Sequence, residues 1–185
     1  IREVALRRDG TLDEEDLARQ ITMKTRVVAL GYASNALGTV NNLPLARRLA
    51  KAAGAWLVVD AVHYAPHFPL DVVELDVDFL LCSAYKFFGP HLGVLYGRRA
   101  AFERLRPHKL VPQDDGIPYR VETGTPNFEG IAGGAAALEF MGSIGGPTAI
   151  ASYEEQLVAR LRAGLRAIAG VRLYEAGPDV AKTPT

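Results

Sequence analysis

The sequence predicts an α/β fold in three layers, α/β/α, built around a mainly parallel β-sheet. Apolar runs of strand length alternate along the chain with segments whose apolar residues recur at helical spacing. This alternation is typical of parallel sheets, because neighbouring parallel strands need a long crossover connection. The chain has 185 residues, of which 49% are hydrophobic, and is therefore large enough for one globular domain with a sizeable core.

The clearest elements form one strand–helix–strand unit. Residues 27–32 (VVALGY) and 55–60 (AWLVVD) are continuous and β-branched enough to predict strands that are buried on both faces. Between them, residues 43–53 (LPLARRLAKAA) have helical period and are followed by Gly54, which is typical of the end of a helix. These residues therefore predict a βαβ unit.

Further elements follow on the C-terminal side of this unit. Residues 78–82 (DFLLC) and 93–96 (GVLY) predict two more strands. Residues 102–119 are rich in proline and charge, which favours a loop over the surface. Residues 130–141 and 148–169 have the pattern of helices.

Charge and composition exclude several classes of partner. Lys and Arg together number 21, as do Asp and Glu, so the net charge favours neither nucleic acid nor an anionic membrane. No apolar run approaches the roughly 18 residues that cross a bilayer, and the N-terminus lacks a signal-peptide pattern. The single cysteine, Cys82, excludes an internal disulfide and suits a reducing compartment. We therefore expect a cytoplasmic protein that binds a small molecule.

Two weaker signals leave this expectation unchanged. His67 and His91 are weak candidates for metal ligands, and we expect no metal site. Basic residues cluster between positions 98 and 109, but Glu103 interrupts them and no aromatic stacking ladder accompanies them. This pattern favours a solvated helix face over a nucleic-acid surface.

Polar side chains follow three of the predicted strands directly. Asn35 comes shortly after the first strand, Asp60 ends the second with His63 three residues on, and Ser83 and Lys86 follow the third. In open α/β sheets, ligands bind beyond the carboxyl ends of the strands. The sequence therefore predicts a ligand site at one edge of the sheet.

Lys86 and Asp60 suggest a particular chemistry for this site. A lysine in partly apolar surroundings is a nucleophile that forms a Schiff base with an aldehyde, and pyridoxal phosphate is a common enzymatic aldehyde. An aspartate facing the pyridine nitrogen of that cofactor keeps the ring protonated. Each residue also has a plainer reading, since a lysine at a strand end is usually solvated and an aspartate there often caps a helix. The pair by itself leaves both readings open.

Longer motifs carry a resemblance to a known family. The segments VVDAVHYAPH and DFLLCSAYKFFGPHLGVLYG, with ASNALGTVNNLP before them and VETGTPN after them, resemble the large domain of class V aminotransferases. The similarity extends over residues 27–141 and is greatest to the cysteine-desulfurase-like branch. It implies the large domain of pyridoxal-phosphate-dependent transferases of fold type I. It also implies that Lys86 carries the cofactor as a Schiff base and that Asp60 pairs with the pyridinium nitrogen.

The same resemblance implies roles for five further residues. Ser83 would bind the cofactor phosphate, Asn35 would lie near the ring hydroxyl and the substrate, and Thr125 would reach the phosphate of a neighbouring subunit. That last role implies a homodimer with its active site at the interface. His63 stands where desulfurases usually have glutamine, and Tyr85 stands where they have histidine. His63 would bind the ring oxygen, and Tyr85 would donate to the phosphate.

The resemblance also implies how the chain is divided and what it lacks. We expect residues 1–145 to form the cofactor-binding core and residues 146–185 a helix and a strand that lead towards a C-terminal small domain. Residues 3–6 and 171–175 have strand-like patterns at the two ends, so we expect a partial chain. The thiol of desulfurases, their early phosphate loop and their substrate-binding arginine have no counterpart here, and we interpret Cys82 as a small buried hydrophobe.

Two hypotheses about function follow. The first is a pyridoxal-phosphate-dependent enzyme that acts on an amino acid, in the manner of a cysteine desulfurase or an aminotransferase. The alternative is a non-catalytic α/β scaffold that keeps the fold without turnover. Sulfur abstraction, amino transfer, elimination and epimerisation stay open within the first hypothesis.

Overall fold

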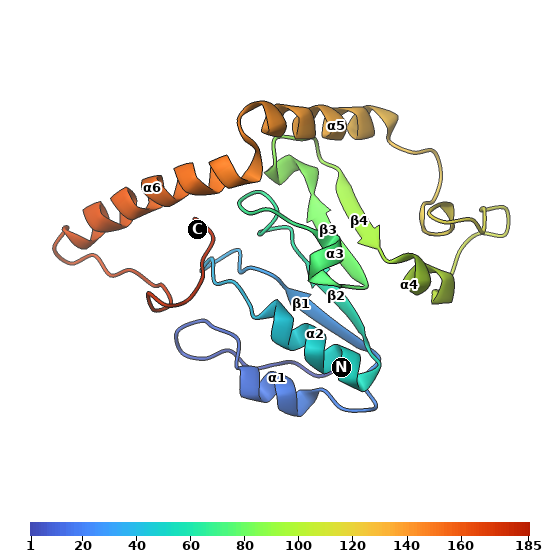
Figure 1. Cartoon of the computed structure of the whole chain (residues 1–185), viewed down its shortest axis with the longest axis horizontal. Helices are drawn as coiled ribbons and strands as arrows, with labels where there is room; N and C mark the ends of the chain where they lie inside the picture. Colours follow the sequence, from blue (N-terminus) through green and yellow to red (C-terminus); the bar gives the residue numbers. More distant parts are fainter.

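A four-stranded mixed sheet forms the centre of the computed structural model, which describes residues 1–185 (Figure 1). The strands are β1 (Val27–Gly31), β2 (Trp56–Asp60), β3 (Phe79–Ser83) and β4 (Gly93–Gly97), and they lie in the order β1-β2-β3-β4. The first three strands are parallel, and β4 pairs with β3 in the antiparallel direction. The predicted α/β architecture with a mainly parallel sheet is confirmed.

Six α-helices and two short 3₁₀ helices connect and flank these strands. They are α1 (Glu14–Gln20), α2 (Leu43–Ala53), α3 (Val72–Leu75), η1 (Ala84–Lys86), α4 (Arg99–Arg104), η2 (Tyr119–Val121), α5 (Phe128–Ser143) and α6 (Gly146–Arg166). The predicted helices around residues 43–53, 130–141 and 148–169 correspond to α2, α5 and α6. None of the helices is both long and apolar enough to span a lipid bilayer.

Local signals at both ends of α2 explain its bounds. The side chain of Asn42 accepts a hydrogen bond from the backbone N–H of Leu45 at 3.0 Å, as helix N-caps do. Gly54 ends the helix in the left-handed conformation with φ 67°, which glycine adopts without a Cβ clash. The helix buries Leu43 and three alanines against β1 and β2, and this small-residue face lets it lie close to the sheet.

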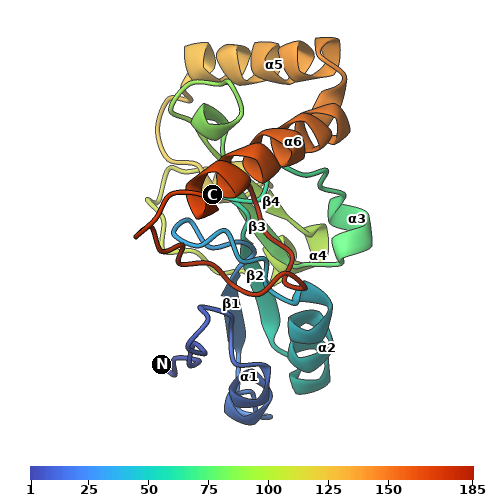
Figure 2. The same ribbon diagram turned by 90° about the vertical axis from the view of Figure 1, so that its left-hand side faces the viewer.

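The main core lies between one face of the sheet and three helices. Figure 2 views the sheet nearly edge-on and shows α2 and α3 on the same side of it. The buried apolar residues of this core include Leu17 of α1, Leu43 of α2, and Val28, Leu57 and Val59 of the sheet. Burial of such side chains from water is the dominant contribution to the stability of the fold.

The opposite face of the sheet is only partly covered. Phe79 packs there against Ala101 and Phe102 of α4, but Val27 is 49% exposed and Leu95 is 46% exposed. The expectation that the first two strands are buried on both faces is therefore wrong for β1, whereas Trp56 and Val58 of β2 are half-buried against this cluster. Alternate side chains of a strand point to opposite faces, so an uncovered face exposes every second residue.

The structure corrects three further expectations. Residues 3–6 and 171–175 form no strands; near the N-terminus there is only an isolated bridge between Leu6 and Leu12. An apolar alternation becomes a strand only where a neighbouring strand supplies hydrogen-bond partners. The predicted loop at residues 102–119 begins with the last turn of α4. The division of the chain at residue 145 stays a prediction, although α6 begins at Gly146.

The C-terminal segment returns to the sheet beside the loop that follows β1. The backbone N–H of Thr183 donates to the carbonyl of Gly38 at 2.8 Å, and the N–H of Val40 donates to the carbonyl of Ala181 at 2.8 Å. Gly38 has φ 70°, and a Cβ placed there would lie 2.8 Å from the backbone oxygen of Thr183. Only glycine therefore fits this contact without a shift of the C-terminal segment.

Gly38→Ala is expected to destabilise the chain by more than about 1 kcal/mol, because it combines an unfavourable φ with a backbone clash. Gly54→Ala is the matched control, since Gly54 has φ 67° but no atom within 4 Å of the added Cβ. Urea denaturation of both variants measures the difference in unfolding free energy. Equal losses in the two variants would contradict the proposed clash with Thr183.

Candidate functional site

The carboxyl ends of β1, β2 and β3 meet at one edge of the sheet. Gly31, Asp60 and Leu81 lie in register across these three strands. The residues that follow each of them therefore come to the same edge, in line with the general location of ligand sites in open α/β sheets. This edge brings together Asp60, His63, Ser83 and Lys86, all of which the sequence analysis named.

Asp60 ends β2 and presents an exposed carboxylate at this edge. Its Oδ1 accepts a hydrogen bond from the backbone N–H of Val62 at 2.9 Å, which orients the carboxyl group in an Asx-type turn. No salt bridge neutralises it, whereas Asp76 pairs with Arg98 and Lys51. The Asp60 carboxylate is thus fixed at one oxygen and available to a cationic group at the other.

Lys86 lies at the end of η1 in a tight turn between β3 and β4. The backbone N–H groups of Phe87 and Gly89 both donate to the carbonyl of Ala84. A Cβ on Gly89 would lie 2.8 Å from the Cβ of Ala84, so this position requires glycine. Phe88 has φ 67°, in the left-handed region that costs a bulky residue roughly 1–2 kcal/mol.

Packing holds this turn in its unfavourable conformation. Phe87 is 8% exposed and packs with Ala84 and Met141 of α5, and the Phe88 ring contacts Phe140 with centroids 5.1 Å apart. Lys86 itself is half-buried and pairs with no carboxylate, whereas Lys51 and Lys109 pair with aspartates. The turn therefore presents a half-buried amine that pairs with no carboxylate.

His63 lies close to Lys86 and is held at one ring nitrogen only. Its Nε2 lies 2.5 Å from the hydroxyl of Thr185, while its Nδ1 is buried and has no hydrogen-bond partner. Burial lowers the pKa of His63, and the positive charge of Lys86 and the neighbouring His67 lower this pKa further. The imidazole is therefore kept neutral beside the amine.

The lowered pKa of His63 predicts a pH dependence of stability. Because its pKa in the folded chain lies below the ordinary value of 6.5, the unfolded chain binds this proton more readily. The corresponding stability is complete above about pH 6.5 and is lost as the pH falls towards the folded-state pKa. His63→Gln is expected to flatten the fall in unfolding free energy between about pH 7 and pH 5. Urea denaturation across this range measures it, with exposed His108→Gln as the control.

Three further predicted site residues differ in how far they are exposed to solvent: Ser83, Tyr85 and Asn35. Ser83 ends β3 opposite Gly93 and is half-buried. Tyr85 is 49% exposed, and its ring stacks on His91 with centroids 5.1 Å apart. Asn35 is exposed in the turn after β1. All three lie on segments that leave the same edge of the sheet.

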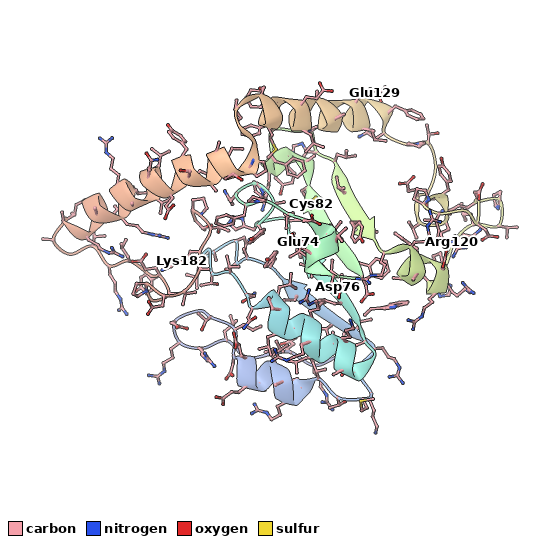
Figure 3. All side chains as sticks on the ribbon, viewed as in Figure 1. Glu74, Asp76, Cys82, Arg120, Glu129 and Lys182 are labelled. Carbon is pink, nitrogen blue, oxygen red and sulfur yellow. The ribbon has the colours of Figure 1, made fainter.

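The structure does not bring Thr125 to this edge within one chain. Thr125 is exposed in the segment between η2 and α5, which Figure 1 shows at the side of the molecule that also carries α4. In the same region, Figure 3 places Arg120 against α4, where its guanidinium donates to the carbonyl of Phe102. A role for Thr125 at this site in a neighbouring subunit stays a prediction.

Sequence reasoning missed the contribution of the C-terminal segment. Thr183 is 1% exposed, and its hydroxyl lies 2.9 Å from that of Thr185, which in turn contacts His63. Figure 3 shows Lys182 below α6, where its ammonium donates to the carbonyls of Ala176 and Gly177. The repeated threonines of the KTPT ending are the one signal that could have drawn attention to this segment.

No group of three or more His, Cys, Asp or Glu side chains gathers at a position that could hold a metal ion. His67 instead pairs with Glu154, and His91 stacks on Tyr85. Cys82 is a free, half-buried cysteine of β3, and burial raises the pKa of its thiol.

The sequence of the chain matches a known protein family. The family model described as aminotransferase class-V matches residues 1–184. The chain belongs to the class V aminotransferase family. Members of this family depend on pyridoxal phosphate, the cofactor expected from the lysine and aspartate at the strand ends.

The family's cysteine desulfurases are among the relatives of the chain. A cysteine desulfurase of Escherichia coli (strain SE11) is 36% identical over 192 residues, which cover 97% of this chain and 47% of that protein. A probable cysteine desulfurase of Halalkalibacterium halodurans is 35% identical over 186 residues, covering 94% of this chain and 45% of that protein. The crystal structure of a cysteine desulfurase from Escherichia coli superposes with a TM-score of 0.83 at 32% identity, covering 95% of this chain and 47% of that one. The chain thus spans about half the length of the curated relatives it matches.

The residues at the strand edge fit pyridoxal phosphate chemically. The buried Nδ1 of His63 lacks a partner, and the half-buried amine of Lys86 pairs with no carboxylate. The Asp60 carboxylate is free at one oxygen. A ligand with an aldehyde, a ring oxygen and a basic ring nitrogen would satisfy all three groups.

Proposed function

We propose that the protein containing this chain is a pyridoxal-phosphate-dependent enzyme that acts on an amino acid and resembles cysteine desulfurases. The observation that carries the proposal is the grouping of Lys86, His63 and Asp60 at one strand edge, with the His63 Nδ1 buried and unpartnered. A non-catalytic scaffold would have no need to keep a neutral histidine beside an unpaired lysine. The membership of the chain in the class V aminotransferase family supports the same reading.

Each residue of the edge would serve one task. When bound, pyridoxal phosphate supplies an aldehyde for a lysine amine and a ring that withdraws electrons from the substrate's α-carbon. Lys86 would hold the cofactor covalently and, once the substrate amine replaces it, would move the α-proton. Asp60 would keep a proton on the ring nitrogen. His63 would hydrogen-bond the ring oxygen through Nδ1, and Asn35 would lie near the same oxygen and the substrate.

The phosphate would bind beside the Lys86 turn. Ser83 precedes this turn and Tyr85 lies within it, and both would donate their hydroxyl hydrogens to phosphate oxygens, which form strong charge-assisted hydrogen bonds. Thr125 would contribute from a second copy of the chain, since within one chain it lies outside the strand edge. The proposal therefore includes a homodimer with its active site at the interface.

The outer surface of α5 supports a second copy as the partner. Phe128 is 63% exposed, Ile131 is 51% exposed and Leu138 is 60% exposed, and these residues lie on a helix that begins three residues after Thr125. An exposed apolar patch of this kind is typical of a protein interface. Its position next to Thr125 fits an interface that brings this residue to the partner's site.

Ile131→Asp combined with Leu138→Asp is expected to weaken the dimer of the full-length protein at least about tenfold, because a buried carboxylate lacks a partner in an apolar contact. Sedimentation equilibrium measures the dissociation constant. Val73→Asp on α3 is the control, since Val73 is 81% exposed outside this surface. If the α5 substitutions leave the dissociation constant of the dimer unchanged, the interface lies elsewhere.

Cys82 does not determine whether the protein removes sulfur from its substrate. Its thiol pKa is raised by burial, so it forms the nucleophilic thiolate less readily than an ordinary cysteine. The chain would thus supply a cofactor site without an activated thiol of its own. One free cysteine also suits the reducing cytoplasm, the location that we propose.

Product analysis of the full-length protein tests the proposed reaction. The protein would be loaded with pyridoxal phosphate and incubated with L-cysteine or with other L-amino acids. With dithiothreitol added as the two-electron reductant, release of sulfide together with alanine from cysteine supports desulfuration, and formation of a keto acid supports amino transfer. Absence of α-proton exchange with every amino acid would favour the non-catalytic scaffold.

A further inference from the structure

A hydrogen bond connects the loop after β2, which carries His63 and His67, to the middle of α6. The Nδ1 of His67 lies 2.9 Å from Oε2 of Glu154, and the two side chains are 16% and 28% exposed. A carboxylate accepts hydrogen bonds and does not donate them, so His67 carries its proton on Nδ1. Glu154 therefore determines both the orientation of the His67 ring and the nitrogen that holds its proton.

This bond is the main polar attachment of α6 near the sheet edge. No residue of α6 is buried, and its Arg162 and Arg166 pair with Glu175 of the following segment and not with the sheet. A cavity of about 590 Å³ lies between α6 and residues 175–184, so close packing does not hold this part of the helix. Figure 2 shows α6 crossing in front of the carboxyl ends of the strands.

His67 in turn restricts the orientation of the His63 ring. The two imidazole rings meet edge to face, with centroids 5.5 Å apart and an interplanar angle of 67°. On its other side, His63 contacts the hydroxyl of Thr185 through Nε2 at 2.5 Å. Two contacts thus orient the ring, and they leave Nδ1 as the ring nitrogen without a hydrogen-bond partner.

We propose that Glu154 and His67 are positioning residues that act through His63, so that the placement of α6 controls how the His63 Nδ1 is presented to the cofactor. This inference rests on the proposed function for the role of His63 towards the ring oxygen. Neither Glu154 nor His67 needs to touch the cofactor. Removing Glu154 frees the His67 ring, and a freed His67 no longer holds the His63 ring edge to face.

Nitrogen-15 NMR of the histidine rings in the full-length protein tests the proposal directly, since it distinguishes a protonated ring nitrogen from a bare one. The signals are assigned with single His→Gln variants. In the wild type, neutral His67 is expected to be protonated on Nδ1. Glu154→Ala is expected to move the proton to Nε2 and to shift the signals of His63 as well. Glu154→Gln keeps an acceptor oxygen and is expected to preserve the wild-type pattern.

Glu155→Ala is the matched control, because Glu155 is the exposed neighbour of Glu154 on the same helix and makes no bond to His67. Loss of the positioned Nδ1 is also expected to raise the dissociation constant of pyridoxal phosphate by up to about tenfold, the worth of one ordinary hydrogen bond. An Nε2-protonated His67 in the wild type would overturn the proposal. So would His63 signals that respond to Glu154→Ala no more than to Glu155→Ala.

The outcomes separate this inference from the proposed function. The ring spectra are recorded with and without pyridoxal phosphate, and Lys86 is labelled independently by borohydride reduction. Labelled Lys86 with unresponsive histidines rejects only the positioning role. Responsive histidines with unlabelled Lys86 reject the proposed function and leave the link from α6 to His63 in place. If Glu154→Ala does not fold, His67→Ala replaces it and is expected to shift the His63 signals in the same way.

Discussion

Lys86→Ala is expected to abolish covalent trapping of pyridoxal phosphate and to lower turnover by at least about a hundredfold, the range typical of a lost general base. The turn after β3 holds this amine half-buried, and the amine pairs with no carboxylate. The full-length protein is incubated with pyridoxal phosphate, reduced with borohydride and mapped by mass spectrometry. The pyridoxyl label is expected on the peptide that contains Lys86.

Lys24→Ala controls for the loss of a lysine as such, because Lys24 is exposed in the turn before β1. This variant is expected to keep both the label and the activity. A pyridoxyl group on a different lysine of the wild type, with Lys86 unmodified, would remove the central assignment of the site.

Asp60→Asn is expected to leave the label on Lys86 but to slow exchange of the substrate α-proton by about a hundredfold or more. Asparagine keeps an oxygen for the N–H of Val62, so the turn after β2 is retained. It loses the charge that holds a proton on the ring nitrogen, and the ring then withdraws electrons poorly. Proton NMR of the amino acid in deuterium oxide measures the exchange rate.

Asp9→Asn is the matched control for this variant. Asp9 makes the same kind of local bond, from the backbone N–H of Thr11 to its Oδ1 at 3.1 Å, but lies in an exposed turn near the N-terminus. Its replacement is expected to leave the exchange rate unchanged. Undiminished exchange in Asp60→Asn would count against a role for this carboxylate at the ring.

The elements that frame the site were predictable because their signals are local. The helix at residues 43–53 agrees with α2 at both ends, since Asn42 and Gly54 cap it irrespective of the rest of the chain. The strands that carry Asp60 and Ser83 agree within about a residue for the same reason, a continuous apolar run that ends in a polar side chain. The terminal strands failed because strand pairing requires a partner that local alternation does not supply.

The sequence by itself determined which side chains come to the strand edge, because Asp60 ends its strand, His63 and Lys86 come within a few residues of theirs, and parallel strands end at a common edge. Only the tertiary structure decided what surrounds them. Thr185 reaches His63 across 122 positions of the chain, and Glu154 reaches His67 across 87. Such contacts depend on how α6 and the C-terminal segment return to the sheet, and no local periodicity or cap encodes that path.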